Sequence, residues 1–265
     1  MEKLSTVQLS GYSILNSDVN KLKYDSKCII NTVNQYSYII AENDKEFKNA
    51  LVNSDVLLPD GVGVVAAVKL LNNQSIKKIA GADVHEHFLN KLNAEGGKCF
   101  YLGSSDKVLS IIKSKVNEQY PNIKIGVYSP PFKASFSADE NDAMINAVNE
   151  FKPDVLFVGM TAPKQEKWIY ANKERLDVGA VCAIGAVFDF FAGTVARPSE
   201  FWRNMGLEWF VRLVNEPKRM YKRYLIYGPA FGLHLLKQKM NQFSKKVAAN
   251  DPYVPQVELN FKNAA

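Results

Sequence analysis

The feature that most constrains this 265-residue chain is a regular alternation of short apolar runs with longer helical patterns. Several of the short runs are apolar throughout, which is typical of strands in a parallel sheet covered on both faces. Strands are expected at residues 28–33, 56–59, 98–103, 123–128, 154–159 and 180–185. Helices are expected at residues 46–54, 61–72, 83–95, 106–120, 138–151 and 164–176. This alternation predicts an α/β fold with a doubly wound, mostly parallel sheet.

The pattern changes after Gly193, where the strands stop and basic and aromatic residues become frequent. Residues 200–216 are expected to form one amphipathic helix, and Pro217 is well placed to begin another. The apolar stripe of the first helix is expected to contain Trp202, Met205, Trp209 and Leu213. The chain is therefore predicted to divide into an α/β body, residues 1–195, a basic helical appendage, 196–245, and a polar tail, 246–265.

The net charge of +6 is concentrated at the C-terminal end of the chain. Residues 1–196 carry 21 Lys and Arg against 22 Asp and Glu, whereas residues 197–265 carry 12 against 5. A neutral body with a basic end favours an anionic partner at that end alone. The same charge leaves open a nucleic-acid-binding module, which would show a steep salt dependence.

The three cysteines and the N-terminal segment indicate the compartment. Cys28, Cys99 and Cys182 are few, scattered and surrounded by apolar residues, so no disulfide framework is expected. The N-terminus lacks the basic start and apolar block of a secretory signal. No stretch reaches the ~18 uninterrupted apolar residues of a membrane span. A cytosolic protein is expected.

Polar side chains follow four of the expected strands. Thr32 and Asn34 close the first, Asp60 the second, and Gly103 and Ser104 the third. Gln165 opens the helix after the fifth strand. Ligands of open α/β sheets bind beyond the carboxyl ends of the strands, near helix N-termini that attract phosphate. These residues are expected to converge at one site.

Each of these polar residues also has a purely structural interpretation. Asp60 could be a turn aspartate that caps the following helix, or a partly desolvated carboxylate that acts as a general base. Thr32 and Asn34 could form turns or hydrogen-bond a ligand. Gln165 could be a solvated first-turn residue or an amide donor to a hydroxyl or phosphate.

Residues 61–66 match the dinucleotide fingerprint GxGxxA, which keeps a nucleotide-dependent oxidoreductase as an alternative. Against it, Asp60 would lie beside the pyrophosphate, and no second strand ends in an acid ~20 residues later. The sequence contains no Asp-x-Asp pair of the kind that holds a metal on a diphosphate. His85 and His87 point to different helix faces, so no metal site is assigned.

The motifs in combination resemble the WecG/TagA/CpsF family of glycosyltransferases, which build bacterial surface polysaccharides and wall teichoic acid linkage units. The resemblance lies in residues 31–34, 57–65, 77–83, 100–105, 153–169 and 185–225, in family order. It implies a Rossmann-like fold with a C-terminal helical appendage. The implied reaction is an inverting transfer, without metal or other cofactor, from a UDP-sugar to a sugar linked to a polyprenyl diphosphate. The implied donor sugar is N-acetylmannosamine, its uronic acid or glucose.

The resemblance also implies roles for single residues. Asp60 matches the general base, and Thr32, Asn34 and Gln165 match residues that line the donor site. Lys78 stands where many relatives have an arginine, and Gly103 and Ser104 belong to the matching turn after the third strand. The appendage positions that would close over the site and meet the diphosphate are Arg212, Arg219, Lys222 and Arg223.

A lipid-linked acceptor implies a peripheral enzyme on the inner face of the bacterial cytoplasmic membrane. The aromatic and basic appendage is suited to an anionic membrane surface, although the same aromatic residues could instead pack the helix onto the body. No nucleic-acid partner is expected on this interpretation, and a homo-oligomer is possible.

Overall fold

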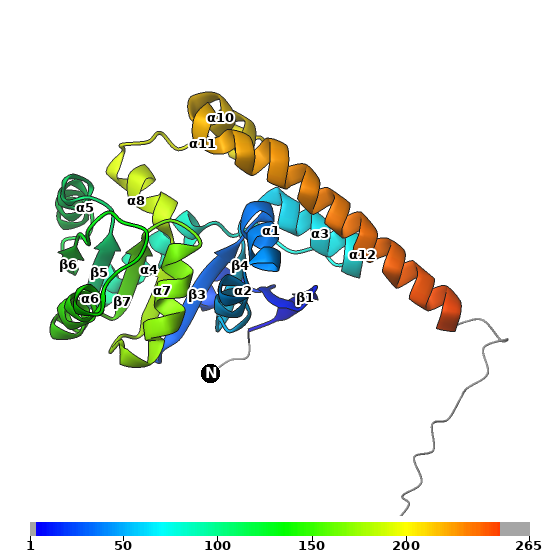
Figure 1. Cartoon of the computed structure of the whole chain (residues 1–265). Helices are drawn as coiled ribbons and strands as arrows, with labels where there is room; N and C mark the ends of the chain where they lie inside the picture. The colour runs from blue at the N-terminus through cyan, green and yellow to red at the C-terminus, as the bar shows by residue number, and fades with distance from the viewer. Residues whose placement is uncertain (1–3, 250–265) are drawn as a thin grey trace, which may run out of the picture.

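The computed structural model of the chain describes residues 4–249, which are built around an eight-stranded sheet (Figure 1). The strand order is β1-β2-β4-β3-β8-β7-β5-β6, and every neighbouring pair is parallel except the β1–β2 hairpin. The strands are β1 (Thr6–Leu9), β2 (Tyr12–Leu15), β3 (Cys28–Val33), β4 (Val56–Pro59), β5 (Lys98–Gly103), β6 (Lys124–Tyr128), β7 (Val155–Gly159) and β8 (Ala180–Ala183). The predicted α/β fold with a mostly parallel sheet is confirmed.

All six predicted strands are present, and the N-terminal hairpin was not predicted. Its two strands have only four residues each, so the alternation along each is short. Ser10 and Gly11 join them with φ angles of 53° and 91°. Two consecutive positive φ angles suit the right-handed twist of a hairpin, and a Ser-Gly pair between alternating apolar residues was the available signal.

Eight helices of the α/β part surround the sheet. They are α1 (Gln35–Asn43), α2 (Lys45–Val52), α3 (Val62–Asn72), α4 (Gly81–Glu95), α5 (Asp106–Gln119), α6 (Ala138–Phe151), α7 (Lys164–Asn172) and α8 (Gly185–Ala192). The six predicted helices are confirmed, while α1 and α8 were not predicted. Helix α8 is almost uniformly apolar, so its sequence shows no helical period.

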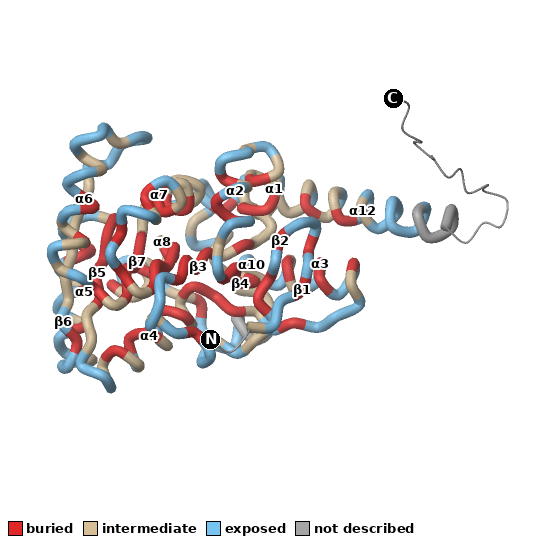
Figure 2. The backbone as a smooth tube through the Cα atoms, turned by 90° about the horizontal axis from the view of Figure 1, so that it is seen from below, coloured by how far each residue is buried: buried red, intermediate tan, exposed pale blue. Residues whose placement is uncertain are grey.

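Alternate strand residues face opposite sides of the sheet and build the core on each side. Ile30, Tyr101 and Cys182 pack with residues of α4, α5 and α8. Leu102 and Val181 belong to a second cluster, which is completed by α6 and α7. The central strands are buried along their length (Figure 2). Both faces are thus covered, which explains why the strands are apolar throughout.

The strand order reverses beside β3. From β3 the chain moves to β4 on one side, and from β4 it crosses to β5 in the other half of the sheet. In sheets of this type a crevice opens at the carboxyl ends where the order reverses, because neighbouring connections leave in opposite directions. Here that position lies between β3 and β8.

The predicted single helix at 200–216 is wrong. The chain forms α9 (Glu200–Asn204) and α10 (Glu208–Asn215), separated at Gly206, whose φ of 72° is left-handed. The N–H of Leu207 donates to the carbonyl of Trp202 at 2.9 Å, as in a glycine-terminated helix end. The predicted stripe is therefore divided between two helices.

The rest of the C-terminal segment is helical to the end of the described residues. After α11 (Pro217–Tyr221) and a π-helical turn (Lys222–Ile226), α12 (Tyr227–Ala249) runs along the body and beyond it (Figure 1). Pro217 begins α11, as predicted. The predicted boundary between appendage and tail falls inside α12, and the remaining tail, 250–265, lies outside the described residues.

Helix α12 is attached to the body through one face. Phe231 and Leu235 are buried, and the Phe231 ring lies 5.1 Å from that of Tyr38 on α1. Gln238 donates to the Tyr38 hydroxyl at 3.1 Å. Among residues 4–249, no helix has the length and apolar character needed to cross a membrane.

Candidate active site

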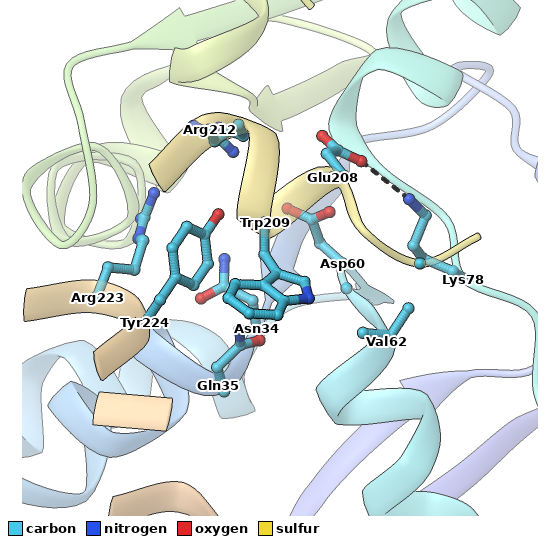
Figure 3. A pocket seen from close by; sticks show the side chains of 12 residues that line it. Asn34, Gln35, Asp60, Val62, Lys78, Glu208, Trp209, Arg212, Arg223 and Tyr224 are labelled. Carbon is cyan, nitrogen blue, oxygen red and sulfur yellow. Dashed lines mark hydrogen bonds and ion pairs between the residues drawn. The ribbon is translucent and has the colours of Figure 1, made fainter. Parts of the chain in front are cut away.

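A cavity of about 350 Å³ lies at the carboxyl ends of β3, β4 and β8. Thr32, Asp60 and Ala183 line it from the sheet side, and residues of α10, α11 and the π-helical turn line it from the C-terminal segment. A second cavity of about 70 Å³ adjoins it and shares Asn34, Asp60, Glu208, Arg212 and Arg223 (Figure 3). The two cavities thus lie between the sheet and the C-terminal helices.

Several helices begin at these cavities. The lining includes first-turn or cap residues of α1, α3, α4, α7 and α8, among them Tyr36, Gly61, Gly81, Gln165 and Gly185. A helix N-terminus has unpaired N–H groups and a partial positive charge, both of which favour an anion. The predicted convergence is therefore present for the ends of β3 and β4 and the start of α7, and the site is suited to phosphate groups.

The Asp60 carboxylate does not cap a helix. Helix α3 has Gly61 as its N-cap, and no side chain caps it. Asp60 instead lines both cavities, and Figure 3 shows it among the side chains around the smaller one. Its pKa is raised, first because burial removes water and second because the Glu208 carboxylate is near; the charges of Lys78, Arg212 and Arg223 oppose the shift. A carboxylate of this kind is suited to accept a proton.

Lys78 and Glu208 join the body to the C-terminal segment above Asp60. The Lys78 ammonium and a Glu208 carboxylate oxygen lie 3.1 Å apart (Figure 3). Lys78 lines the smaller cavity, whereas Glu208 lines both. The predicted ligand-binding cation at position 78 is therefore paired with a carboxylate in this structure.

Two arginines of the C-terminal segment face both cavities. Arg212 Nε and Nη2 are buried without hydrogen-bond partners, and its guanidinium lies 5.3 Å from the Phe190 ring centre. Arg223 lies 4.5 Å from the Tyr36 ring centre. Burial and the neighbouring Arg212 lower the pKa of Arg223. Buried guanidinium donors without partners form a ready site for a diphosphate.

Arg219 and Lys222 line the larger cavity from more exposed positions. The Arg219 guanidinium pairs with Glu216, three residues earlier in the chain, at 2.6 Å. The structure therefore brings all four predicted basic residues of the appendage to the cavity.

The polar residues predicted to line the donor site all reach the cavity. Asn34 Oδ1 accepts hydrogen bonds from the backbone N–H groups of Tyr36 and Ser37, so its predicted structural role is also present. Gln165 Oε1 accepts from the N–H of Met160, and its Nε2 donates to Glu166. Thr32 lies near the end of β3.

Gly103 and Ser104 do not line either of these cavities. Gly103 has a φ of 121°, and a Cβ there would lie 2.3 Å from the carbonyl oxygen of Gly159. The Ser104 N–H donates to the same oxygen at 3.0 Å. The structure therefore places both residues in the contact between β5 and β7.

The cavity walls also contain residues that sequence reasoning did not select: Glu166, Arg197, Glu208, Trp209 and Tyr224. Glu166 had a signal, because it follows Gln165 at the same helix start. Glu208 and Trp209 had no signal of a role in the site. Both lay inside the single helix predicted for residues 200–216, where the break that starts α10 at Glu208 was not expected.

The described residues contain no group of three or more His, Cys, Asp or Glu side chains that could hold a metal ion. His85 is buried and pairs with the Tyr101 hydroxyl at 2.7 Å, whereas His87 pairs with the Leu22 carbonyl. The two histidines thus have separate partners.

Comparison with known proteins identifies the family. The model of the glycosyl transferase WecG/TagA/CpsF family matches residues 6–245. A protein of Bacillus subtilis strain 168 is 33% identical over 214 residues, covering 81% of each chain. A Bacillus spizizenii protein is 27% identical, and the match covers 82% of this chain and 80% of that protein. A Staphylococcus aureus protein is 25% identical, and the match covers 77% of this chain and 72% of that protein. All three are named N-acetylglucosaminyldiphosphoundecaprenol N-acetyl-beta-D-mannosaminyltransferase. With a family model matching nearly its whole length around this cavity, the chain belongs to the WecG/TagA/CpsF family of glycosyl transferases.

Proposed function

We propose that the protein transfers N-acetylmannosamine from UDP-N-acetylmannosamine to N-acetylglucosaminyl-diphosphoundecaprenol in teichoic acid synthesis. The names of its relatives support the transferred sugar and the acceptor. Family membership favours sugar transfer over the oxidoreductase and nucleic-acid alternatives. One observation carries the proposal. The Asp60 carboxylate, which does not cap a helix, lines the same cavity as Arg212, whose buried N–H donors have no hydrogen-bond partners.

In the proposed reaction, Asp60 removes the proton from the attacking acceptor hydroxyl. The acceptor oxygen forms a bond to the anomeric carbon, the bond from that carbon to the diphosphate oxygen breaks, and UDP leaves with the electron pair. One displacement of this kind inverts the anomeric carbon.

The departing diphosphate would be stabilised by protein charges. Arg212 and Arg223 face the cavity from the C-terminal segment, and the helix N-termini face it from the body. Donors that are already oriented stabilise charge as it develops, without waiting for water to reorganise. We therefore propose that the reaction proceeds without a divalent metal.

We also propose that the protein acts as a peripheral enzyme at the inner face of the cytoplasmic membrane. An undecaprenyl chain would keep the acceptor in the bilayer, so the open side of the cavity must approach its surface. The C-terminal helices combine exposed apolar side chains with most of the net positive charge, which suits an anionic membrane.

The test is a donor screen with a prenyl-diphosphate N-acetylglucosamine acceptor. UDP-N-acetylmannosamine, its uronic acid, UDP-glucose and UDP-N-acetylglucosamine are compared with and without EDTA. Only the first is expected to support rapid transfer, at the same rate in EDTA. Preference for another donor would contradict the assignment of the sugar. Loss of activity in EDTA would contradict the metal-free mechanism.

A second experiment tests the base. Asp60→Asn keeps the size of the side chain but cannot accept the proton, so kcat is expected to fall about 10²–10⁴-fold. The Kd for UDP, measured by calorimetry, should change little. An Asp60→Asn enzyme with normal turnover would refute the assignment.

A further inference from the structure

Glu166 is a buried carboxyl group in the wall of the larger cavity that the proposed reaction does not use. It belongs to the first turn of α7, and its side chain is only 1% exposed. Its Oε1 accepts a hydrogen bond from Gln165 Nε2 at 2.9 Å. Its Oε2 is equally buried but has no hydrogen-bond partner. Buried polar atoms in folded proteins are nearly always paired, so an unpaired oxygen on a residue that lines a cavity is a candidate contact for a ligand group.

The Glu166 carboxyl is held in place by its neighbours. Gln165 links it to the backbone, because Gln165 Oε1 accepts from the N–H of Met160 at 3.2 Å. Gly185 leaves room for this amide, since a Cβ there would lie 2.6 Å from Gln165 Oε1. The unpaired oxygen is therefore a fixed acceptor rather than the end of a mobile side chain.

The charges around Glu166 allow it to ionise near neutral pH. Burial raises its pKa to about 7, while the hydrogen bond from Gln165 and the charge of Arg223 act in the opposite direction. The next residue, Lys167, pairs with Asp44 and Glu46 at 2.6 and 3.2 Å instead. When ionised, the carboxylate can only accept hydrogen bonds.

The position of Glu166 indicates which substrate it meets. Asp60 follows β4, whereas α7 follows β7, and β3 and β8 lie between these strands. Three strand spacings correspond to about 14 Å. If Asp60 receives the acceptor hydroxyl, the anomeric carbon of the donor must lie beside that hydroxyl, and the rest of the donor can occupy the part of the cavity lined by Glu166.

We propose that Glu166 determines specificity for the donor, with Oε2 accepting a hydrogen bond from a hydroxyl or N–H group of the bound UDP-sugar. That the ligand is a UDP-sugar rests on the proposed function. It assigns no proton transfer to Glu166.

The test uses Glu166→Gln, which keeps the shape of the side chain. The carboxylate of Glu166 can accept one hydrogen bond at each oxygen, from Gln165 and from the ligand. The carboxamide of the variant has one oxygen and one NH₂ group, and the NH₂ group can only donate. The Kd of UDP-N-acetylmannosamine, measured by calorimetry without acceptor, is expected to rise about 10–100-fold.

The matched control is Asn172→Ala in the same helix. Asn172 is also buried, and it donates to the Trp168 carbonyl at 2.9 Å, but it does not line either cavity described above. Its loss should lower the melting temperature and leave the Kd unchanged.

A pH series separates a ligand contact from a merely structural role. Below pH 7, protonation of Oε2 replaces the acceptor with a donor, so the wild-type Kd should rise as the pH falls. The Glu166→Gln variant should lack this component. Equal pH dependence in the two proteins would overturn the proposal.

Two ligands distinguish the source of the donated hydrogen bond. A variant that binds UDP normally but UDP-N-acetylmannosamine weakly places the group on the sugar, and equal weakening places it on the nucleotide. Either result supports the proposal. A folded Glu166→Gln protein with wild-type Kd values overturns it and leaves the proposed function intact. Failure of the wild-type protein to bind any UDP compound overturns both.

Discussion

Asp60 shows how a single residue can acquire a chemical role from its neighbours. Its sequence context allowed a helix cap or a general base, and the glycine that follows it became the cap. The carboxylate was thereby left to face the cavities. Its pKa is raised by burial and by Glu208, a residue 148 positions later in the chain.

The Lys78–Glu208 pair is expected to set the pH at which Asp60 becomes active. Activity requires ionised Asp60, so the rate should rise with pH through its pKa. Removing the negative charge in Glu208→Gln should lower that pKa and move the acidic limb of the kcat profile to lower pH. Lys78→Met removes a positive charge and should move the limb to higher pH.

Opposite shifts of the two single variants are the diagnostic result, since loss of the ion pair alone would affect both in the same way. Rate profiles between pH 5 and 9, at saturating substrates, provide the measurement. If both limbs coincide with that of the wild-type protein, the base is not Asp60 or the two charges do not act on it.

At the level of elements, the contact between the ends of β5 and β7 explains two residues that were predicted to belong to the site. Gly103 and Ser104 belong to a family-like turn, yet they line neither of the two cavities. Their backbone contacts Gly159 so closely that no side chain fits at position 103. A glycine is required here for packing between two strands.

Gly103→Ala is therefore expected to destabilise the fold. Left-handed strain and the clash with the Gly159 carbonyl together should cost about 2–5 kcal/mol. The control is Gly96→Ala, which also has a positive φ but has no atom within 4 Å of the added Cβ, and should cost about 1 kcal/mol. Thermal unfolding of the two variants measures the difference, and equal melting temperatures would contradict the packing explanation.

For the whole molecule, the notable feature is the unequal distribution of exposed apolar side chains. Among the described residues, all but four of the exposed large apolar side chains lie between Phe201 and Phe243. Helix α12 presents a continuous stripe of them on the face opposite Phe231 and Leu235. The stripe consists of Leu233, Leu236, Met240 and Phe243. Residues 241–244 of α12 are all exposed.

Replacing these four residues with glutamine should weaken membrane binding without unfolding the protein. Burying even part of four apolar side chains is favourable enough that binding to phosphatidylglycerol vesicles should fall about tenfold or more. A double variant, Val52→Gln with Phe132→Gln, removes exposed apolar side chains elsewhere and should bind normally.

Vesicle sedimentation at several salt concentrations measures the effect, and transfer to a short-chain, water-soluble acceptor should persist in both variants. Unchanged vesicle binding by the quadruple variant would exclude this face as the membrane contact. A wild-type dimer that becomes monomeric in the quadruple variant would instead assign the face to a second copy of the chain.

The sequence by itself determined the α/β class, six of the strands and the residues at their ends, because apolar periodicity and turn residues act over a few neighbouring positions. Asp60, Thr32, Asn34 and Gln165 were found in this way. Local patterns could not show which oxygen of Glu166 lacks a partner, that Glu208 would lie beside Asp60, or that Gly103 would meet Gly159. These facts depend on contacts between segments far apart in the chain, and only the tertiary structure, by packing the C-terminal helices over the strand ends, decided them.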